Sequence, residues 1–345
     1  GFGQVFHNGG GAQRTHYLQL PSDLLSHSNV SKELTIGFWV SAKGMVPGDY
    51  TWAPIFSAYT EAPKTKTVTP EEGDAYEQSY NDWTLICMQS RGIFRVNCAG
   101  WCDFDNAQNT SGTNSIYSTN AGGTTNWLGD NEWHYMTLTM TETDVIIYLD
   151  GEAKNHWTVD GTDGKSVSGV FSNGNILDYI CLGGNQEGDW KDNDMPFSFD
   201  DFMVTNKALD ATGITAILDA KVLGIAQALY DDVSYSTGKD ALLTAINTLT
   251  ATSSAANRTA LYTAIDTYRK ANASLSHSYL VALNDADFSQ GVTNWTLDSD
   301  GAWWDVLRGD GPNGYSHFVE KFQENGITVS SSITQTTGSL PAGRY

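Results

Sequence analysis

Two adjacent aspartates, Asp200 and Asp201, lie at the centre of the strand-like segment FSFDDFMVTNKALD, residues 197–210. Successive side chains of a strand point to opposite faces, so a core that receives Phe202 and Val204 also receives Asp200. A buried carboxylate costs several kcal/mol unless another group pairs with it. Backbone N–H groups, a cation or a buried base could do so, and the available arginines include Arg14, Arg91 and Arg95. Ca²⁺, a hard ion that binds oxygen ligands, suits this acidic chain with its many loop carbonyls.

Tryptophans in loop-like segments are candidates for sugar binding, since an exposed indole ring can stack on a sugar ring. Asp189, next to Trp190, could accept hydrogen bonds from sugar hydroxyls. For each tryptophan, packing into a core is the alternative interpretation, and the loop 187–196 is alternatively a solvated acidic loop or a second cation site. The candidate platforms are Trp101, Trp127 and Trp190, followed by Trp303 with its neighbours Trp295 and Trp304.

The charge of the chain restricts its partners. Its 345 residues include 40 acidic and 19 basic side chains, which gives a net charge of −21. Such a surface repels phosphate backbones and anionic lipids, so we expect no nucleic-acid binding and no membrane insertion. We expect an extracellular or cell-surface protein whose leader peptide has been removed. Of the four cysteines, Cys87 and Cys181 are expected in the core, whereas Cys98 and Cys102 could form a bridge.

Alternation of apolar and polar residues predicts an antiparallel β-sandwich in the first two thirds of the chain. The Asp150–Gly151 pair predicts a two-residue hairpin turn between two strands. Long segments rich in Gly, Asn and Thr, at 103–131 and 184–196, are expected as loops at one rim. The predicted strands are 34–40, 53–59, 83–89, 93–98, 134–140, 144–150 and 176–182.

Helical periodicity predicts a three-helix spacer over residues 211–275. Thr212, Thr237 and Ser254 are the expected N-caps of its helices. A β pattern returns at 276–345, where we expect a second, incomplete β-sandwich after the first domain at 1–210. The expected apolar faces have the spacing i, i+4, i+7 and comprise Leu242, Ile246 and Leu249, then Leu261, Ile265 and Tyr268.

An ordered set of motifs resembles a known sandwich family. LTIGFWV, NEWHYMTLTM, DVIIYLDGE, ICLGGN and FSFDDFMVTNKALD together resemble the concanavalin A-like, laminin-G-type domains of bacterial surface proteins. The helical part resembles FIVAR-type modules. NDADFSQGVTNWTLD with SSSITQTTGSLPAGRY resembles part of a galactose-binding-like jelly roll, as used in carbohydrate-binding modules. These resemblances imply a modular extracellular protein that handles glycans.

The sandwich resemblance also implies a structural Ca²⁺. In such domains the aspartate at the position of Asp200 helps to hold the ion beside the N-terminal segment, here VFHNGGGAQ. Asn8 is the ligand that this segment offers, and Gly44 is a weaker candidate. Asp201, on the opposite face, is expected to be solvated or bonded to a loop.

The glucanases of this fold need acidic residues arranged Glu-x-Asp-x-x-Glu. Glu142 and Asp144 come nearest, but Ile147 takes the third acidic position and the pair falls at a hairpin turn. No nucleophile motif accompanies the histidines, and no glycine-rich phosphate loop precedes a helix. We therefore expect no catalytic residue and a protein that is not an enzyme.

The sequence thus predicts a non-catalytic, carbohydrate-binding protein with a glycan partner. A protein-adhesion or structural module, with a protein partner at the rim loops, is the first alternative. An accessory or degenerate glycoside hydrolase is the second alternative.

Overall fold

The computed structural model divides the chain into two compact units, Gly1–Ala216 and Ile217–Tyr345. The division into three parts at 210 and 275 stays a prediction. The structure describes residues 5–8, 16–26, 29–41, 53–59, 64–69, 73–80, 83–90, 93–97, 104–105, 132–159, 167–171, 177–183 and 197–279, then 281, 283, 292, 294–299, 303–308, 317–322, 331–336 and 340.

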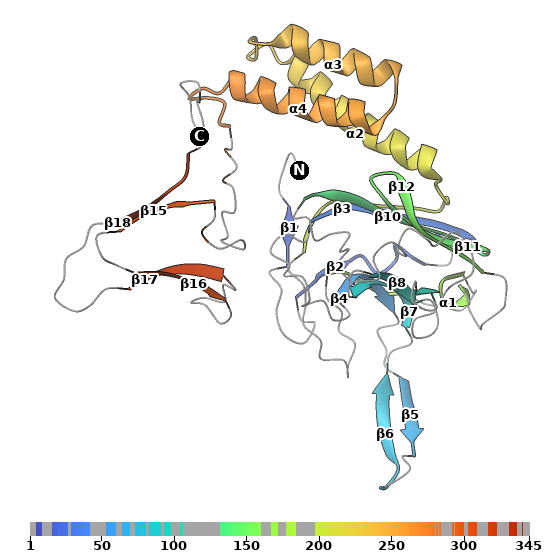
Figure 1. Cartoon of the computed structure of the whole chain (residues 1–345). Helices are drawn as coiled ribbons and strands as arrows, with labels where there is room; N and C mark the ends of the chain where they lie inside the picture. Colours follow the sequence, from blue (N-terminus) through green and yellow to red (C-terminus); the bar gives the residue numbers. More distant parts are fainter. Residues whose placement is uncertain are drawn as a thin grey trace. The chain divides into compact units, whose positions relative to one another are not determined.

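Unit 1 is an antiparallel β-sandwich, which confirms the predicted fold class (Figure 1). Its first sheet has the order β1-β14-β3-β10-β11-β12, so strands from both ends of the unit lie side by side. These strands are β1 (Phe6–His7), β14 (Ser198–Thr205), β3 (Glu33–Ser41), β10 (His134–Thr141), β11 (Asp144–Leu149) and β12 (Glu152–Thr158).

The second sheet of the sandwich has the order β2-β13-β4-β7-β8-β9. A short helix, α1 (Ser168–Phe171), precedes β13 in the chain. All the strands predicted from alternation occur, with ends that differ by a few residues. The strands of the second sheet are β2 (Leu18–Leu20), β13 (Tyr179–Leu182), β4 (Ala53–Tyr59), β7 (Trp83–Ser90), β8 (Ile93–Asn97) and β9 (Phe104–Asp105).

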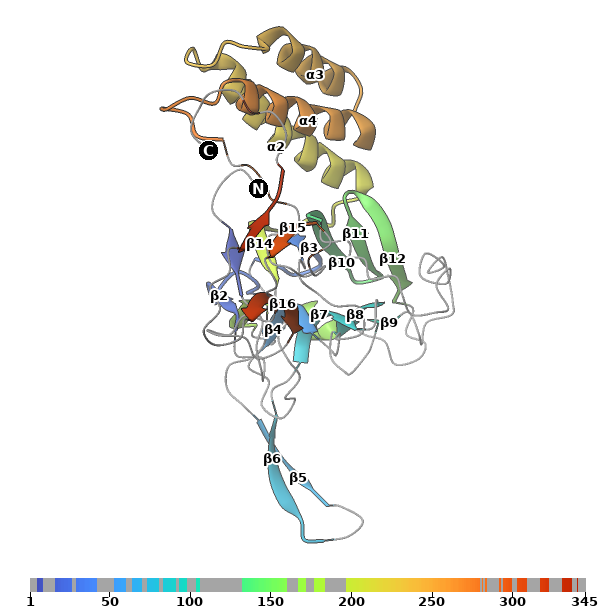
Figure 2. The ribbon, with the colours of Figure 1, turned by 60° about the vertical axis from the view of Figure 1, so that its left-hand side comes forward.

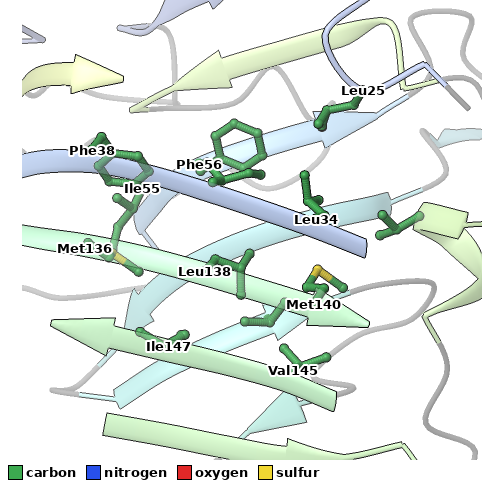
Figure 3. Packing of buried hydrophobic residues seen from close by; sticks show 14 of the residues in the cluster. Leu25, Leu34, Phe38, Ile55, Phe56, Met136, Leu138, Met140, Val145 and Ile147 are labelled. Carbon is green, nitrogen blue, oxygen red and sulfur yellow. The ribbon is translucent and has the colours of Figure 1, made fainter. Parts of the chain in front are cut away.

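The main core lies between the two sheets. Alternate residues of β3, β10 and β11 point into it and meet side chains of β4, as Figure 3 shows. On β3 the residues of the core cluster are Leu34, Ile36, Phe38 and Val40, so Trp39 lies on the opposite, outer face of this sheet. The side chains alternate with the period of two of a strand, but the outer face of β3 and β10 is buried as well, since Thr35, Thr137 and Thr139 are at most 3% exposed.

The Asp150–Gly151 turn confirms the predicted hairpin between β11 and β12. Both residues have positive φ, 55° and 85°, which is the backbone of a type I′ turn. Gly151 also lacks space for a side chain, because a Cβ there would lie 2.7 Å from Thr215 Oγ1. The turn therefore requires glycine for two separate reasons.

Three helices pack together: α2 (Ala211–Asp231), which begins in unit 1 and continues into unit 2, α3 (Lys239–Ala251) and α4 (Ala255–Ala271). All six residues predicted on the apolar faces of α3 and α4 are buried in one cluster with Val222 and Ala226 of α2. Ser254 caps α4 as predicted, since its side chain accepts a hydrogen bond from Asn257 N–H. The other two predicted caps are wrong.

Residues next to the expected caps begin the other two helices. Gly238, in the left-handed conformation, stands at the N-cap of α3 in place of Thr237. Ahead of α2, Asp210 Oδ1 accepts a hydrogen bond from Gly213 N–H at 2.8 Å, so the cap is Asp210 and not Thr212. A carboxylate at this place also interacts favourably with the positive end of the helix dipole.

By length and composition α2 could span a membrane, and among the described residues it alone passes this test. Its sequence interrupts the apolar run with Asp219, whose carboxylate pairs with Arg258 Nε at 2.8 Å. Both side chains are buried, and Ser253 Oγ donates a second hydrogen bond to Asp219. Val222 and Ala226 pack against α3 and α4, so these apolar residues of α2 form part of the core between the helices.

Short two-stranded sheets complete the described structure. β5 (Lys64–Val68) pairs with β6 (Tyr76–Tyr80) in a ribbon that lies apart from both sheets of the sandwich in Figures 1 and 2. In unit 2, β15 (Thr296–Ser299) pairs with β18 (Ser331–Thr334), and β16 (Trp303–Arg308) pairs with β17 (His317–Phe322). Cys181 is buried and free, as expected, whereas Cys98 and Cys102 lie outside the described residues.

Candidate functional site

A β-bulge in β14 determines where the two adjacent aspartates point. Between β14 and β3 the register shifts after Asp200 and resumes at Met203. Asp201 has a positive φ of 51°, the conformation that inserts an extra residue into a strand. Phe199 and Phe202 therefore both point toward the core, although they are three positions apart and not the two positions that a regular strand would require.

The prediction that Asp200 faces the core is wrong for this reason. The bulge changes the phase of alternation, so Asp200 shares no face with Phe202 and lies half-buried on the outer face of the sheet. Its Oδ1 accepts a hydrogen bond from Asp201 N–H at 2.8 Å. A backbone N–H group, one of the three partners considered from the sequence, thus bonds to Asp200. Asp201 is exposed, as expected.

Asn8 holds the edge of the sandwich together. Its Oδ1 accepts a hydrogen bond from Phe197 N–H at 2.8 Å, and its own N–H donates to the Phe197 carbonyl at 3.0 Å. Its Nδ2 reaches Gly183 beyond β13, where a Cβ would lie only 2.5 Å away. The Asn8 side chain is therefore 5% exposed and lies between the two sheets.

Asp200 and Asn8 do not fit a single Ca²⁺ ion. Phe6 pairs with Phe199, so Asn8 is three register positions from Asp200, a separation of ~10 Å along the strand. The two side chains also lie on opposite faces, whereas Ca²⁺ ligands stand at about 2.3–2.6 Å from the ion. Gly44 lies outside the described residues. Within the described part of the chain no group of three His, Cys, Asp or Glu residues converges, and Ca²⁺ at Asp200 stays a prediction.

Four residues on the outer face of the first sheet form what we call the outer-face cluster: Trp39, Tyr135, Asp200 and Asp201. Trp39 of β3 pairs in register with Asp200 on one side and with Tyr135 of β10 on the other. The Trp39 and Tyr135 rings meet edge to face, with centroids 5.6 Å apart. Trp39 itself is half-buried.

Gly37 allows Tyr135 to lie flat across β3. A Cβ at Gly37 would lie 2.6 Å from Tyr135 Oη, so any side chain there would displace the phenol ring. Tyr135 is consequently 3% exposed, although it points away from the main core. No hydrogen bond joins its Oη to another residue that the structure describes.

The electrostatics of the cluster keep Tyr135 protonated. Burial, and then the charge of Asp201, raise the pKa of Tyr135 to about 12. Tyr135 Oη therefore remains a hydrogen-bond donor at any physiological pH. The cluster thus combines an aromatic edge, a hydroxyl donor and two carboxylate acceptors on one face.

Most of the binding residues predicted from the sequence lie outside the described part of the chain: Trp101, Trp127, Trp190 and Asp189. The backbone of Trp303 lies in β16, but its side chain is not described. The sequence interpretation missed Trp39, because a tryptophan inside a strand was taken as core. Alternation in LTIGFWV places Trp39 on the face of the strand opposite Phe38 and Val40. This pattern could have identified Trp39 as a residue outside the main core.

No protein-family model matches the chain, and no curated protein sequence matches it. The laminin-G and FIVAR resemblances accordingly stay predictions.

Several solved structures are similar to the chain at a distance. A mutant sialidase of Trypanosoma rangeli with trans-sialidase activity shares 12% identity over 53% of this chain and 22% of its own, with a TM-score of 0.31. A structure of botulinum neurotoxin type C, described for its interaction with two ganglioside molecules, shares 15% identity over 63% of this chain and 45% of its own, with a TM-score of 0.35. The binding domain of botulinum neurotoxin DC in complex with rat synaptotagmin II shares 16% identity over 55% and 36%, with a TM-score of 0.30.

These likenesses are too distant to assign a family, and the chain spans less than half of each matched structure. One prediction is corrected by them. The sequence led us to expect that the chain is not an enzyme, but sialidases are among the solved structures similar to it.

Proposed function

We propose that this protein binds carbohydrate and that the outer-face cluster contacts the sugar. The single observation that carries the proposal is the half-buried residue Trp39, whose ring meets Tyr135 edge to face and which is bordered by Asp200 on the neighbouring strand. A sugar ring presents C–H groups that stack on an indole and hydroxyls that bond to carboxylates. A pre-positioned aromatic ring loses little conformational entropy when it binds.

The composition and charge of the chain support the same function. Eleven tryptophans and sixteen tyrosines supply many possible stacking surfaces, and a net charge of −21 disfavours polyanionic partners. The loop tryptophans Trp101, Trp127 and Trp190 remain part of the proposal as further contacts. An extracellular or cell-surface location belongs to the proposal too, since polysaccharides and glycoconjugates are displayed there.

The test is a glycan array probed with the whole chain, with and without added Ca²⁺, followed by titration of the strongest hits. We expect Trp39→Ala to weaken binding about tenfold or more, equivalent to ~1.4 kcal/mol, because the stacking surface is lost. Trp39→Phe should retain part of the affinity, since it keeps a smaller aromatic ring.

Melting curves must show that the variants remain folded, because Trp39 also packs against Tyr135. Matched substitutions of Trp101, Trp127 and Trp190 by Ala serve as comparisons. If one of these abolishes binding while Trp39→Ala leaves it intact, the sugar site lies in the loops. If no glycan binds the folded protein under either condition, the proposed function is wrong.

A further inference from the structure

The carboxylates of the outer-face cluster give it a local negative charge. Asp200 stands directly opposite Trp39 across the β14–β3 pair, and the exposed Asp201 follows it in the bulge. The Asp201 charge reaches Tyr135, whose pKa it helps to raise. A ligand that stacks on Trp39 therefore lies within the field of two carboxylates.

The hydrogen-bonding groups of the cluster match hydroxyls. A carboxylate accepts a hydrogen bond from a sugar O–H, and Asp200 and Asp201 supply two carboxylates beside Trp39. Asp200 Oδ1 already accepts from Asp201 N–H, and a carboxylate has a second oxygen that can accept further hydrogen bonds. A hydroxyl can serve both as donor and as acceptor, whereas a sugar carboxylate or sulfate only accepts and carries the same charge as the aspartates.

We infer that the outer-face cluster selects uncharged sugars and disfavours sugars that carry a carboxylate or sulfate. This inference rests on the proposed function and deepens it, because it states the ligand class and names Asp200 and Asp201 as the residues that set it. A ligand carboxylate in contact with these two side chains should lose about tenfold in affinity relative to its uncharged counterpart, from Coulomb repulsion at a wet surface.

Matched pairs of glycans test the inference on the whole chain. The probes are lactose against 3′-sialyllactose, and each neutral array glycan against its sialylated or sulfated form. Affinities are measured with EDTA present, so that no divalent cation neutralises the carboxylates. Measurement at about 10 mM and at 300 mM NaCl separates charge from shape, since salt screens repulsion at an exposed site.

The test variants are Asp200→Asn, Asp201→Asn and both together. Asparagine keeps the side-chain oxygen that accepts from Asp201 N–H, and it tolerates the positive φ of position 201. Glu142→Gln is the matched control, because it removes one exposed carboxylate from the turn between β10 and β11.

We expect neutral glycans to bind more tightly than their acidic forms at low salt. The difference should shrink at high salt and in the double Asn variant, and it should persist in Glu142→Gln. The inference is overturned, with the proposed function intact, by equal or tighter binding of the acidic forms. Binding that requires added Ca²⁺, or a difference that the double variant leaves unchanged, overturns it as well. Absence of any glycan binding overturns the proposed function itself.

Discussion

Asp144 shows how a residue that resembled a catalytic acid is held in a structural role. Its Oδ1 accepts a hydrogen bond from His156 Nε2 at 2.7 Å, and Thr143 Oγ1 donates to its Oδ2 at 2.6 Å. The Thr143 hydrogen bond, and then that of His156, lower the pKa of Asp144 below its ordinary value. These contacts join β11 to β12 at the open end of their hairpin.

This pKa shift predicts a pH-dependent contribution to stability. A carboxyl group with a lowered folded pKa stabilises the protein above the unfolded pKa, and the contribution disappears as pH falls through the folded pKa. We expect Asp144→Asn to reduce the free energy of unfolding at pH 7 by no more than about 1 kcal/mol, because solvent screens this exposed pair. The loss should shrink as pH falls below the unfolded pKa of about 3.9 and should disappear once pH is below the folded pKa.

Urea unfolding of the variant and the parent chain between pH 3 and 7 measures this effect. Glu142→Gln, two residues away, controls for the change in net charge. If the loss in the free energy of unfolding stays constant across this pH range, the lowered pKa of Asp144 does not contribute to stability.

The predicted Ca²⁺ ion at Asp200 can be tested by chelation. If an ion binds at the β14 bulge, EDTA should lower the melting temperature, and Asp200→Ala should remove this sensitivity, since the ion contributes its binding free energy to folding. Asp201→Ala is the matched control and should keep the sensitivity. Asn8→Ala should destabilise the chain with and without chelator alike, since Asn8 bonds to Phe197 instead. Identical melting of the parent chain with and without EDTA would exclude the ion.

The sequence contains the signal for the bulge that redirects these aspartates. Apolar residues recur at Phe197 and Phe199, then at Phe202 and Val204, so the period of two is interrupted by one extra residue. Strict alternation through Asp200 overlooked this shift. The cross-strand neighbours of Asp200 could not be predicted, because they depend on the register between β14 and β3, which are far apart in sequence.

At the scale of elements, Asn272 joins the end of α4 to the loop between α2 and α3. Its Oδ1 accepts hydrogen bonds from Ser236 N–H and Thr237 N–H, both at 2.9 Å. Its Nδ2 donates to the carbonyls of Thr237 and Tyr268 at 2.9 and 2.7 Å. One amide thus bonds to four backbone groups, of which the Tyr268 carbonyl also accepts a hydrogen bond from Asn272 N–H at 3.2 Å.

We expect Asn272→Ala to destabilise unit 2 by about 1–3 kcal/mol, because it leaves several of these backbone groups without partners. Asn272→Asp should cost less, since it keeps the two acceptor bonds and loses the donors. Urea unfolding should show a lower midpoint with an unchanged slope. Asn257→Ala, which removes a single exposed bond to the Thr252 carbonyl, is the control. An equal loss in both alanine variants would contradict the special role of Asn272.

The helices and strands were easier to predict from the sequence than the residues at which they begin and end. The apolar faces of α3 and α4 follow from local spacing alone, and all six predicted residues are buried. The start of α3 at Gly238 depends instead on a left-handed turn that Asn272 stabilises from the far end of α4. The buried Asp219–Arg258 pair was missed, because the pairing of Asp219 in α2 with Arg258 in α4 depends on how the two helices pack.

At the scale of the whole molecule, composition and alternation predicted the sandwich but not its closure. The order β1-β14-β3 brings residue 6 beside residue 199, and no local pattern contains this information. Asn8 and Gly183 complete the closure, since the amide of Asn8 occupies the space that a Gly183 side chain would need. The sequence marked Asn8 as a ligand through a resemblance, and its role as a clamp between sheets emerges only from the tertiary contacts.

Under the proposed function, the left-handed backbone of Asp201 places the thermal stability of the protein in conflict with its selectivity among sugars. Glycine would adopt a φ of 51° without the steric cost of about 1 kcal/mol that an L side chain incurs there. The same replacement would delete an exposed carboxylate of the outer-face cluster. A laboratory selection for thermostability alone would thus favour glycine at this position and erode ligand discrimination, so engineered versions of this protein should be screened for both properties at once.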